Sequence, residues 1–307
     1  MRCTLVLAVF LCLTPLLAFA EDPAPAGEGL GKALAAFLAE TDEDKRAAAG
    51  FALAMQHPDP AAVAKAIPTA RKWPAGADKG DIIRWKRSTA DGKEHSIFAA
   101  IPEAYDAKKA WPVLIWLHGA VARPVDGGGL TGVRVLAEMA DEEGFIVLSP
   151  SAQTGSEWWL PTGVDLVRGS LDDLKRKYRV DANRVAVTGF SDGASGCMHL
   201  LAHDPEPYAC FLPLMSHPGV TRLAGGPSFA VNVQSRPVFA VNGGQDTLYP
   251  SAQIKPLIDQ LKAAGCDLTW LDLPEAGHRI QDVFPEHWDK LRDFWKAHPR
   301  VPLAKTI

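Results

Sequence analysis

The fold of this 307-residue chain is indicated by residues 184–194, which read RVAVTGFSDGA. The valine-rich run at 184–187 predicts a strand, and residues 194–203 predict a helix. Between them lies Gly189-Phe190-Ser191-Asp192-Gly193, which fits the pattern G-x-S-x-G. A sharp turn from a strand into a helix crowds the backbone, so the residues two before and two after the serine have to be small. The two glycines satisfy this demand, and such a turn exposes the serine hydroxyl.

Two backbone N–H groups are expected to stabilise an oxyanion beside this serine. The N–H of Asp192 lies at the start of the predicted helix, where the helix dipole favours negative charge. A second donor is expected from the loop after an earlier strand, and Leu117-His118-Gly119-Ala120 ends the strand predicted at 113–117. We assign this donor to the N–H of Ala120. His118 is interpreted as a side chain that braces the loop, not as a base.

A serine nucleophile needs a base, and the base needs an acid that fixes its tautomer. The strand predicted at 238–241 leads into a turn that ends on Asp246, and the next predicted strand leads into a loop that carries His278. Carboxyl ends of parallel strands meet at one edge of a sheet, so Ser191, Asp246 and His278 are predicted to form a catalytic triad. Asp272 is a second candidate for the acid, but it falls within a predicted strand close to the base.

Short apolar runs alternate with helical segments over residues 81–307. This alternation is typical of an α/β fold with a mostly parallel central sheet and helices on both faces. The first two strands are joined by a turn at 90–92 and are predicted to be antiparallel. The predicted strands are 81–87, 95–101, 113–117, 145–148, 184–187, 211–215, 238–241 and 268–273. The predicted helices are 132–143, 164–178, 194–203, 252–264 and 285–298.

Taken together, the HG loop, the serine turn, the acid turn and the Ala-Gly-His ending resemble the α/β-hydrolase family over about residues 81–295. Within that family the chain is most similar to carboxylesterases of the feruloyl-esterase-like and polyhydroxyalkanoate-depolymerase-like types. The resemblance implies hydrolysis of carboxylic esters through an acyl-enzyme, without a metal or an organic cofactor. Residues 118–120 read HGA where many lipases have HGGG, and about twenty residues separate the strands that end at 215 and begin at 238. A large lid domain does not fit there, so an open cleft for small-molecule or polymer-end esters is expected.

The N-terminal residues are expected to direct export. Arg2 precedes an apolar run at 5–17, and Ala18-Phe19-Ala20 fits an A-x-A cleavage site. Residues 1–20 are therefore interpreted as a signal peptide, and the mature protein is expected to begin at Glu21. The apolar run is shorter than the roughly 20 residues that a spanning helix needs. We expect a periplasmic or extracellular protein without a stable membrane anchor.

Residues 21–80 are predicted to form a tether followed by a short helical extension. Leucines at 30, 34 and 38 recur at a spacing of four, Thr41 with Asp44 resembles a capping box, and Asp59-Pro60 places a cap before a first-turn proline. The extension is interpreted as helices that cover part of the core. A surface that binds a partner is the alternative. Residues 81–307 are then the catalytic domain.

Composition and charge narrow the possible partners. The chain is 47% hydrophobic and 22% charged, which is ordinary for a globular protein. Its net charge of −4 provides no broad basic field, so nucleic acid is not an expected partner. The oligomeric state stays open. After cleavage Cys197, Cys210 and Cys266 remain, and an oxidising compartment could join two of them; their spacing does not indicate which two, nor a zinc site.

Several other side chains are candidates for the site. Trp158 and Trp159 lie in a loop beyond a predicted strand and are possible substrate contacts, as is His217, although ordinary packing is an equal alternative. His199 and His203 stand four apart on one helical face, but no third ligand is evident and no metal is predicted. Arg279 beside the base is interpreted as a solvated surface residue.

The function predicted from these residues is hydrolysis of carboxylic esters by a secreted serine hydrolase. One alternative is a serine peptidase of the prolyl-oligopeptidase-like branch, which uses the same triad; a dipeptide amide cleaved faster than a matched ester would favour it. The other alternative is a noncatalytic binding protein on the same fold. An intact triad argues against that alternative.

Overall fold

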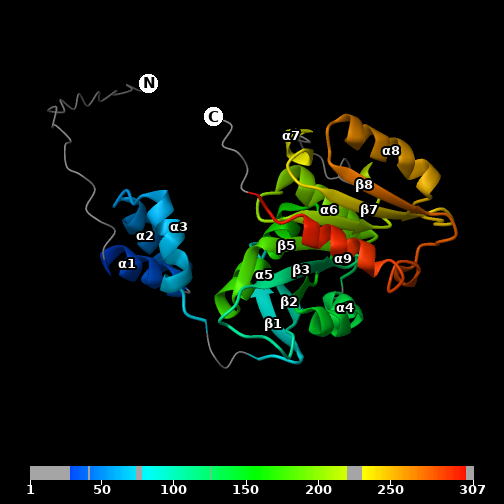
Figure 1. Cartoon of the computed structure of the whole chain (residues 1–307). Helices are drawn as coiled ribbons and strands as arrows, with labels where there is room; N and C mark the ends of the chain where they lie inside the picture. The colour runs from blue at the N-terminus through cyan, green and yellow to red at the C-terminus, as the bar shows by residue number, and fades with distance from the viewer. Residues whose placement is uncertain (1–27, 41, 74–77, 125, 220–229, 302–307) are drawn as a thin grey trace, which may run out of the picture. The chain divides into compact units, whose positions relative to one another are not determined.

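The computed structural model describes residues 28–40, 42–73, 78–124, 126–219 and 230–301 (Figure 1). The chain divides into two units, Met1–Lys72 and Trp73–Ile307. The predicted catalytic domain begins later, at residue 81. Trp73 begins the second unit, and its Nε1 donates to the Lys175 carbonyl of that unit at 3.2 Å. The predicted signal peptide lies outside the described residues.

The first unit contains three helices. They are α1 (Glu28–Ala39), α2 (Glu43–Ala54) and α3 (Pro60–Ala70). Asp59 caps α3 as predicted, since its carboxylate accepts hydrogen bonds from the N–H groups of Ala61 and Ala62. Asp42 caps α2 and accepts from the Lys45 N–H. The predicted cap Thr41 lies outside the described residues.

The second unit is built on an eight-stranded sheet with the order β1-β2-β4-β3-β5-β6-β7-β8. Strands β1 and β2 pair antiparallel, β2 and β4 also pair antiparallel, and every later neighbour pairs parallel. The prediction of a mostly parallel sheet is confirmed. The strands are β1 (Ile82–Ser88), β2 (Glu94–Ala100), β3 (Trp111–Leu117), β4 (Ile146–Pro150), β5 (Val180–Phe190), β6 (Cys210–Leu214), β7 (Val238–Gly243) and β8 (Leu268–Leu273).

Helices cover both faces of this sheet (Figure 1). On one face, α5, α6 and α8 pack against alternate strand residues such as Val113 and Ile115; on the other, α4 and α9 pack against Leu114 and Trp116. This alternation is expected for strands buried on both sides. The helices are α4 (Gly129–Glu143), α5 (Pro161–Lys177), α6 (Asp192–His203), α7 (Ala230–Val233), α8 (Ser251–Ala263) and α9 (Trp288–Ala297), with a 3-10 turn, η2 (Ile280–Asp282).

The three described cysteines are buried free thiols. Cys197, Cys210 and Cys266 form no disulfide. The sequence had left open that two of them pair, and the structure pairs none. Burial raises the pKa of Cys266 to about 12, so its thiol stays protonated and unreactive near neutral pH. Among the described residues, no helix has both the length and the apolar character required to cross a membrane.

Candidate active site

Ser191 lies in the turn between β5 and α6. Strand β5 ends at Phe190 and α6 begins at Asp192, and Ser191 has φ 58° and ψ −118°. A non-glycine residue with this backbone conformation costs about 1–3 kcal/mol, which the surrounding packing has to offset. A Cβ atom at Gly189 would lie 2.6 Å from the carbonyl carbon of Gly193, so the turn leaves no space for a side chain there. The demand for small residues on both sides of the serine is therefore real in this chain.

Asp246 and His278 are joined by a short hydrogen bond. The His278 Nδ1 lies 2.7 Å from Asp246 Oδ2. Because an ionised carboxylate only accepts hydrogen bonds, Nδ1 carries the proton and Nε2 is left as the basic nitrogen. The second oxygen, Oδ1, accepts the N–H groups of Leu248 and Tyr249, both at 2.8 Å. Asp246 is almost fully buried, and these three donors fix the orientation of its carboxylate.

The three predicted triad residues lie at the same edge of the sheet. Ser191 follows β5, Asp246 follows β7 and His278 follows β8, and these strands run parallel. The ring of Phe190, next to the serine, lies 4.8 Å from the His278 ring, measured between centroids. The alternative acid Asp272 is exposed on β8 and pairs in register with Asn242. It does not take the position of the acid, which Asp246 occupies.

The loop after β3 passes directly against the serine turn. We call residues 118–124 the oxyanion loop. A Cβ atom at Gly119 would lie 3.1 Å from the Ser191 Cβ, which shows how closely the loop backbone approaches the serine. The following Ala120 has a φ of 55°, a conformation that residues with a side chain rarely adopt. The N–H of Val121 donates to Asp192 Oδ2 at 3.1 Å. Of the two predicted donors, Asp192 follows Ser191 directly, and Ala120 lies between Gly119, which approaches the serine, and Val121, which binds Asp192.

No family model matches the chain. A bifunctional acetylxylan esterase/xylanase from Neocallimastix patriciarum is 29% identical over 179 residues, covering 57% of this chain and 24% of that protein. A thermostable esterase of known structure has a TM-score of 0.61 at 19% identity, over 72% of this chain and 63% of the esterase. This protein has the α/β-hydrolase fold. An acylaminoacyl peptidase from Pyrococcus horikoshii shares it, with a TM-score of 0.57 at 11% identity over 75% of this chain and 43% of the peptidase.

His118 braces the oxyanion loop. Its Nδ1 lies 2.8 Å from the Gly119 carbonyl, and its Nε2 accepts the N–H of Ala152 at 3.0 Å. Since a carbonyl accepts and an N–H donates, His118 is the neutral tautomer with its proton on Nδ1. Burial lowers the pKa of His118, which keeps this tautomer neutral. One nitrogen contacts the loop itself and the other contacts the segment after β4, in agreement with the bracing role predicted for His118.

For Trp158 the sequence left substrate contact and ordinary packing open, and the structure shows it packed in the core. Its side chain is 0% exposed and its Nε1 donates to the His118 carbonyl at 2.9 Å. The indole also packs edge-on against the His118 ring, with 5.3 Å between centroids. Trp158 therefore supports the oxyanion loop through its contacts with His118. The adjacent Trp159 is half-buried and packs against the core.

His217 lies one aromatic ring away from the predicted base. Its ring packs edge-on against Tyr249 at 5.4 Å between centroids, and Tyr249 packs edge-on against His278 at 5.5 Å. His217 Nδ1 also accepts the N–H of Gly219. Tyr249 was missed by the sequence reasoning, although it belongs to the turn that carries the predicted acid. Both side chains are half-buried beside the catalytic edge.

The loop that carries His278 is held by Asp282. Asp282 Oδ2 accepts the N–H of Gly277 at 2.7 Å, and both carboxylate oxygens bind the Arg279 guanidinium. The hydrogen bond from Arg279 holds the pKa of the half-buried Asp282 below its usual value. Arg279 is thus a surface residue with an intramolecular partner.

The histidine pair on α6 is packed within the helix surface. The rings of His199 and His203 stack with 4.1 Å between centroids. His199 is buried, and burial together with the neighbouring His203 lowers its pKa to about 4. In the part of the chain that the structure describes, no three His, Cys, Asp or Glu side chains are grouped so as to hold a metal ion.

Proposed function

We propose that this protein is a secreted serine carboxylesterase whose catalytic triad is Ser191, Asp246 and His278. The observation that carries the proposal is the 2.7 Å hydrogen bond between Asp246 and His278 Nδ1, formed at the sheet edge where the strained Ser191 turn lies. A buried acid that orients an imidazole beside an exposed hydroxyl is the arrangement that nucleophilic acyl transfer needs. The esterases among the similar proteins support the same reaction class.

The proposed reaction begins when the Ser191 hydroxyl attacks the ester carbonyl carbon. His278 Nε2 takes the hydroxyl proton, and the Asp246 carboxylate stabilises the resulting imidazolium. The negative charge that develops on the carbonyl oxygen is stabilised by the N–H groups of Ala120 and Asp192. The imidazolium then protonates the leaving alcohol, and the acyl group stays on the serine.

Deacylation repeats these steps with water as the nucleophile. His278 takes a proton from water, the hydroxide attacks the acyl-enzyme carbonyl, and the serine leaves with the proton from His278. The carboxylic acid is released and the enzyme returns to its starting state. The proposed steps use only groups of this chain and water, so no cofactor or metal ion is part of the proposal.

The first test is hydrolysis of p-nitrophenyl esters, from acetyl to long acyl chains, by the protein that begins at Glu21 and by its Ser191→Ala variant. We expect hydrolysis by the wild type and a loss of at least about 1,000-fold in the variant, because no other group supplies the nucleophile. Acetylated xylan is a useful further substrate, given the acetylxylan esterase among the relatives. An S191A variant that retains wild-type turnover would contradict the assignment.

A serine peptidase is the second candidate, favoured by the acylaminoacyl peptidases among the structural neighbours. The chain covers less than half of those peptidases, so the similarity leaves most of their length unmatched. Comparison of an N-acyl dipeptide amide with the matched ester decides between the two reactions. A binding protein without activity would show no labelling of Ser191 by a fluorophosphonate.

We also propose that residues 1–20 are removed during export to the periplasm or the outside of the cell. The proposal rests on the A-x-A site before Glu21 in the sequence. N-terminal sequencing of the protein recovered from the exported fraction tests it, with Glu21 expected as the first residue. The proposed partners are small-molecule or polymer-end esters, and nucleic acid and a membrane anchor are not among them.

A further inference from the structure

The side chain of Asp192 makes a contact that its proposed role as a backbone donor does not require. Asp192 Oδ2 accepts the N–H of Val121 at 3.1 Å. Val121 is the residue directly after Ala120, whose N–H is the second proposed oxyanion donor. We propose that Asp192 is a positioning residue, whose carboxylate holds the oxyanion loop in place beside the serine turn. This inference rests on the serine esterase function proposed above.

The loop needs such a contact because its backbone is strained at the donor itself. Ala120 has a φ of 55°, and no regular secondary structure spans the loop. Val121 is 0% exposed, so removal of the Asp192 carboxylate would leave a buried N–H that has lost this hydrogen bond. A buried unpaired N–H costs about 1–3 kcal/mol, which the loop can avoid by changing its backbone conformation. That change would move the Ala120 N–H away from the reacting carbonyl.

Asp192 thereby links the two proposed donors through one hydrogen bond, from the Val121 N–H to its own carboxylate. Its own N–H is one donor, and its carboxylate fixes the residue next to the other. The distance between the donors is then set by a single residue at the start of α6. Oxyanion donors act only when they are already in place at the position where the charge develops, so this spacing bears directly on the rate of the chemical step.

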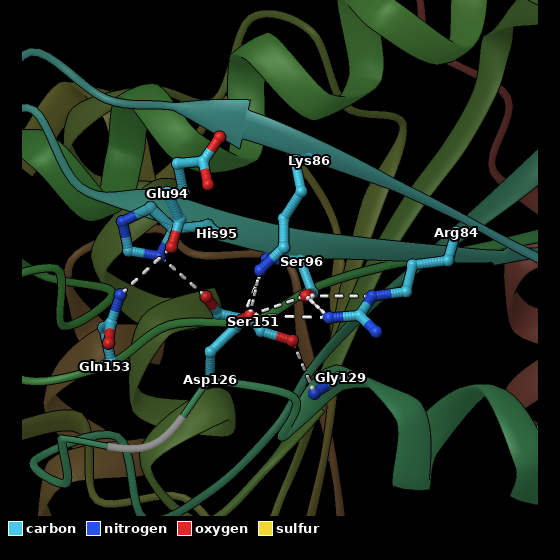
Figure 2. A network of polar contacts seen from close by, with 9 residues as sticks. All are labelled: Arg84, Lys86, Glu94, His95, Ser96, Asp126, Gly129, Ser151 and Gln153. Carbon is cyan, nitrogen blue, oxygen red and sulfur yellow. Dashed lines mark hydrogen bonds and ion pairs between the residues drawn. The ribbon is translucent and has the colours of Figure 1, made fainter.

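The distal end of the same loop region is held separately. Figure 2 shows Asp126 bound to the strands β1 and β2. Asp126 Oδ1 accepts the Ser96 N–H at 2.8 Å, and Oδ2 accepts the Ser96 hydroxyl and the Lys86 ammonium, both at 2.6 Å. Arg123 is also fixed, since its carbonyl accepts the Thr154 N–H at 3.0 Å. Loss of the Asp192 carboxylate should therefore release the Ala120 end alone.

The test compares Asp192→Ala with Asp192→Asn in the protein that begins at Glu21, with p-nitrophenyl acetate as substrate. The amide oxygen of asparagine can accept the Val121 N–H, whereas alanine cannot. We expect D192A to lower kcat by about tenfold to 100-fold with KM changed less than about threefold, because a misplaced donor weakens transition-state binding. D192N is expected to keep kcat within about threefold of the wild type.

Asp173→Ala serves as the matched control. Asp173 is a half-buried carboxylate on α5 that pairs with Arg87 at 3.0 Å and Arg176 at 2.7 Å. We expect D173A to lower the melting temperature while kcat stays unchanged. A loss of kcat in D173A equal to that in D192A would mean that general destabilisation explains the effect.

Hydrogen exchange of the peptide that contains Val121 provides a readout independent of activity. Exchange should be faster in D192A than in the wild type and in D192N. The inference is overturned if D192A keeps the wild-type kcat and exchange rate, or if D192N loses as much kcat as D192A, since a charge effect would then explain the loss. If the wild type hydrolyses no ester and no fluorophosphonate labels Ser191, the proposed function fails, and the exchange data alone decide whether Asp192 holds the loop.

Discussion

At the scale of single residues, the site depends on hydrogen bonds that fix tautomers. Asp246 forces the proton of His278 onto Nδ1, and the Gly119 carbonyl forces the proton of His118 onto Nδ1 as well. The outcomes differ because of what the Nε2 atoms contact. In His118 the Nε2 accepts the Ala152 N–H, so this imidazole is structural, whereas none of the described residues forms such a hydrogen bond with the Nε2 of His278, the proposed base. One residue type thus provides a brace and the proposed base within a single site.

The buried His199 makes the stability of this protein depend on pH. Its pKa is lowered from 6.5 to about 4 in the folded state. Between these two values the unfolded chain binds a proton that the folded chain does not. The contribution of the neutral His199 to stability is therefore fully present above about pH 6.5 and is lost as the pH falls towards 4. We expect the free energy of unfolding, measured by urea titration, to decrease over this range.

His199→Gln is expected to make that decrease smaller. His118 contributes in the same direction, since its pKa is also lowered, and a part of the dependence should therefore persist in the variant. An H199Q profile that is as steep as the wild-type profile would contradict this account.

At the scale of elements, the sequence predicted the ends of some strands more accurately than those of others. Strand β8 has the bounds expected from the sequence, whereas β5 begins at Val180 and not at residue 184. The additional residues include Asp181 and Asn183, whose polar side chains are typical of a loop. They lie in the strand because Val180, just before them, pairs with Trp111 of β3. The short helix α7 was also missed, because four residues carry no periodic signal. Tertiary pairing decided these boundaries.

The loop side chains explain why the site was predicted only in part. The triad was predictable because each member follows a recognisable strand, and backbone order alone brings those positions to one edge. The direction of a side chain within a loop has no such signal. Trp158 and Trp159 are adjacent in the sequence, yet Trp158 is 0% exposed while its neighbour is half-buried. Tyr249 was missed for the same reason.

The hairpin β1–β2 should depend on Asp126 for its connection to the loop after β3. Burial raises the pKa of Asp126, but hydrogen bonds from Lys86 and Ser96 outweigh this effect and lower it overall. We expect Asp126→Ala to lower the free energy of unfolding by about 1–3 kcal/mol, because the fully buried Ser96 loses two hydrogen bonds. Asp289→Ala, which removes an exposed carboxylate paired with Arg292, should have an effect within about 0.5 kcal/mol. Equal effects in urea titrations would contradict the expected importance of the Asp126 network.

At the scale of the whole molecule, both hydrophobic clusters that cover the sheet lie within the unit Trp73–Ile307. The predicted triad and oxyanion residues lie in the same unit. The helices of Met1–Lys72 have their own buried residue, Leu34, and their own capping residues. The physical requirements of the proposed site are therefore met without the helical extension.

A chain that begins at Trp73 is accordingly expected to fold and to hydrolyse p-nitrophenyl acetate with a kcat within about threefold of the protein that begins at Glu21. A chain that begins at residue 89 lacks β1 and should be less stable, because Asp126 and Asp173 lose their partners Lys86 and Arg87 with that strand. Thermal unfolding and ester hydrolysis check both variants. An inactive but folded chain from Trp73 would assign the extension a part in the activity.

The three buried thiols have a use beyond their place in the core. In the protein that begins at Glu21, Cys197, Cys210 and Cys266 are the cysteines that remain, and each is shielded in the native state. A reagent that modifies thiols can reach them only when the surrounding structure opens. Because Cys197 lies on α6, the helix that follows the proposed nucleophile, while Cys266 precedes β8, their separate rates of modification would time the opening of different parts of the protein. The native cysteines can therefore report the rates of local unfolding without any introduced label.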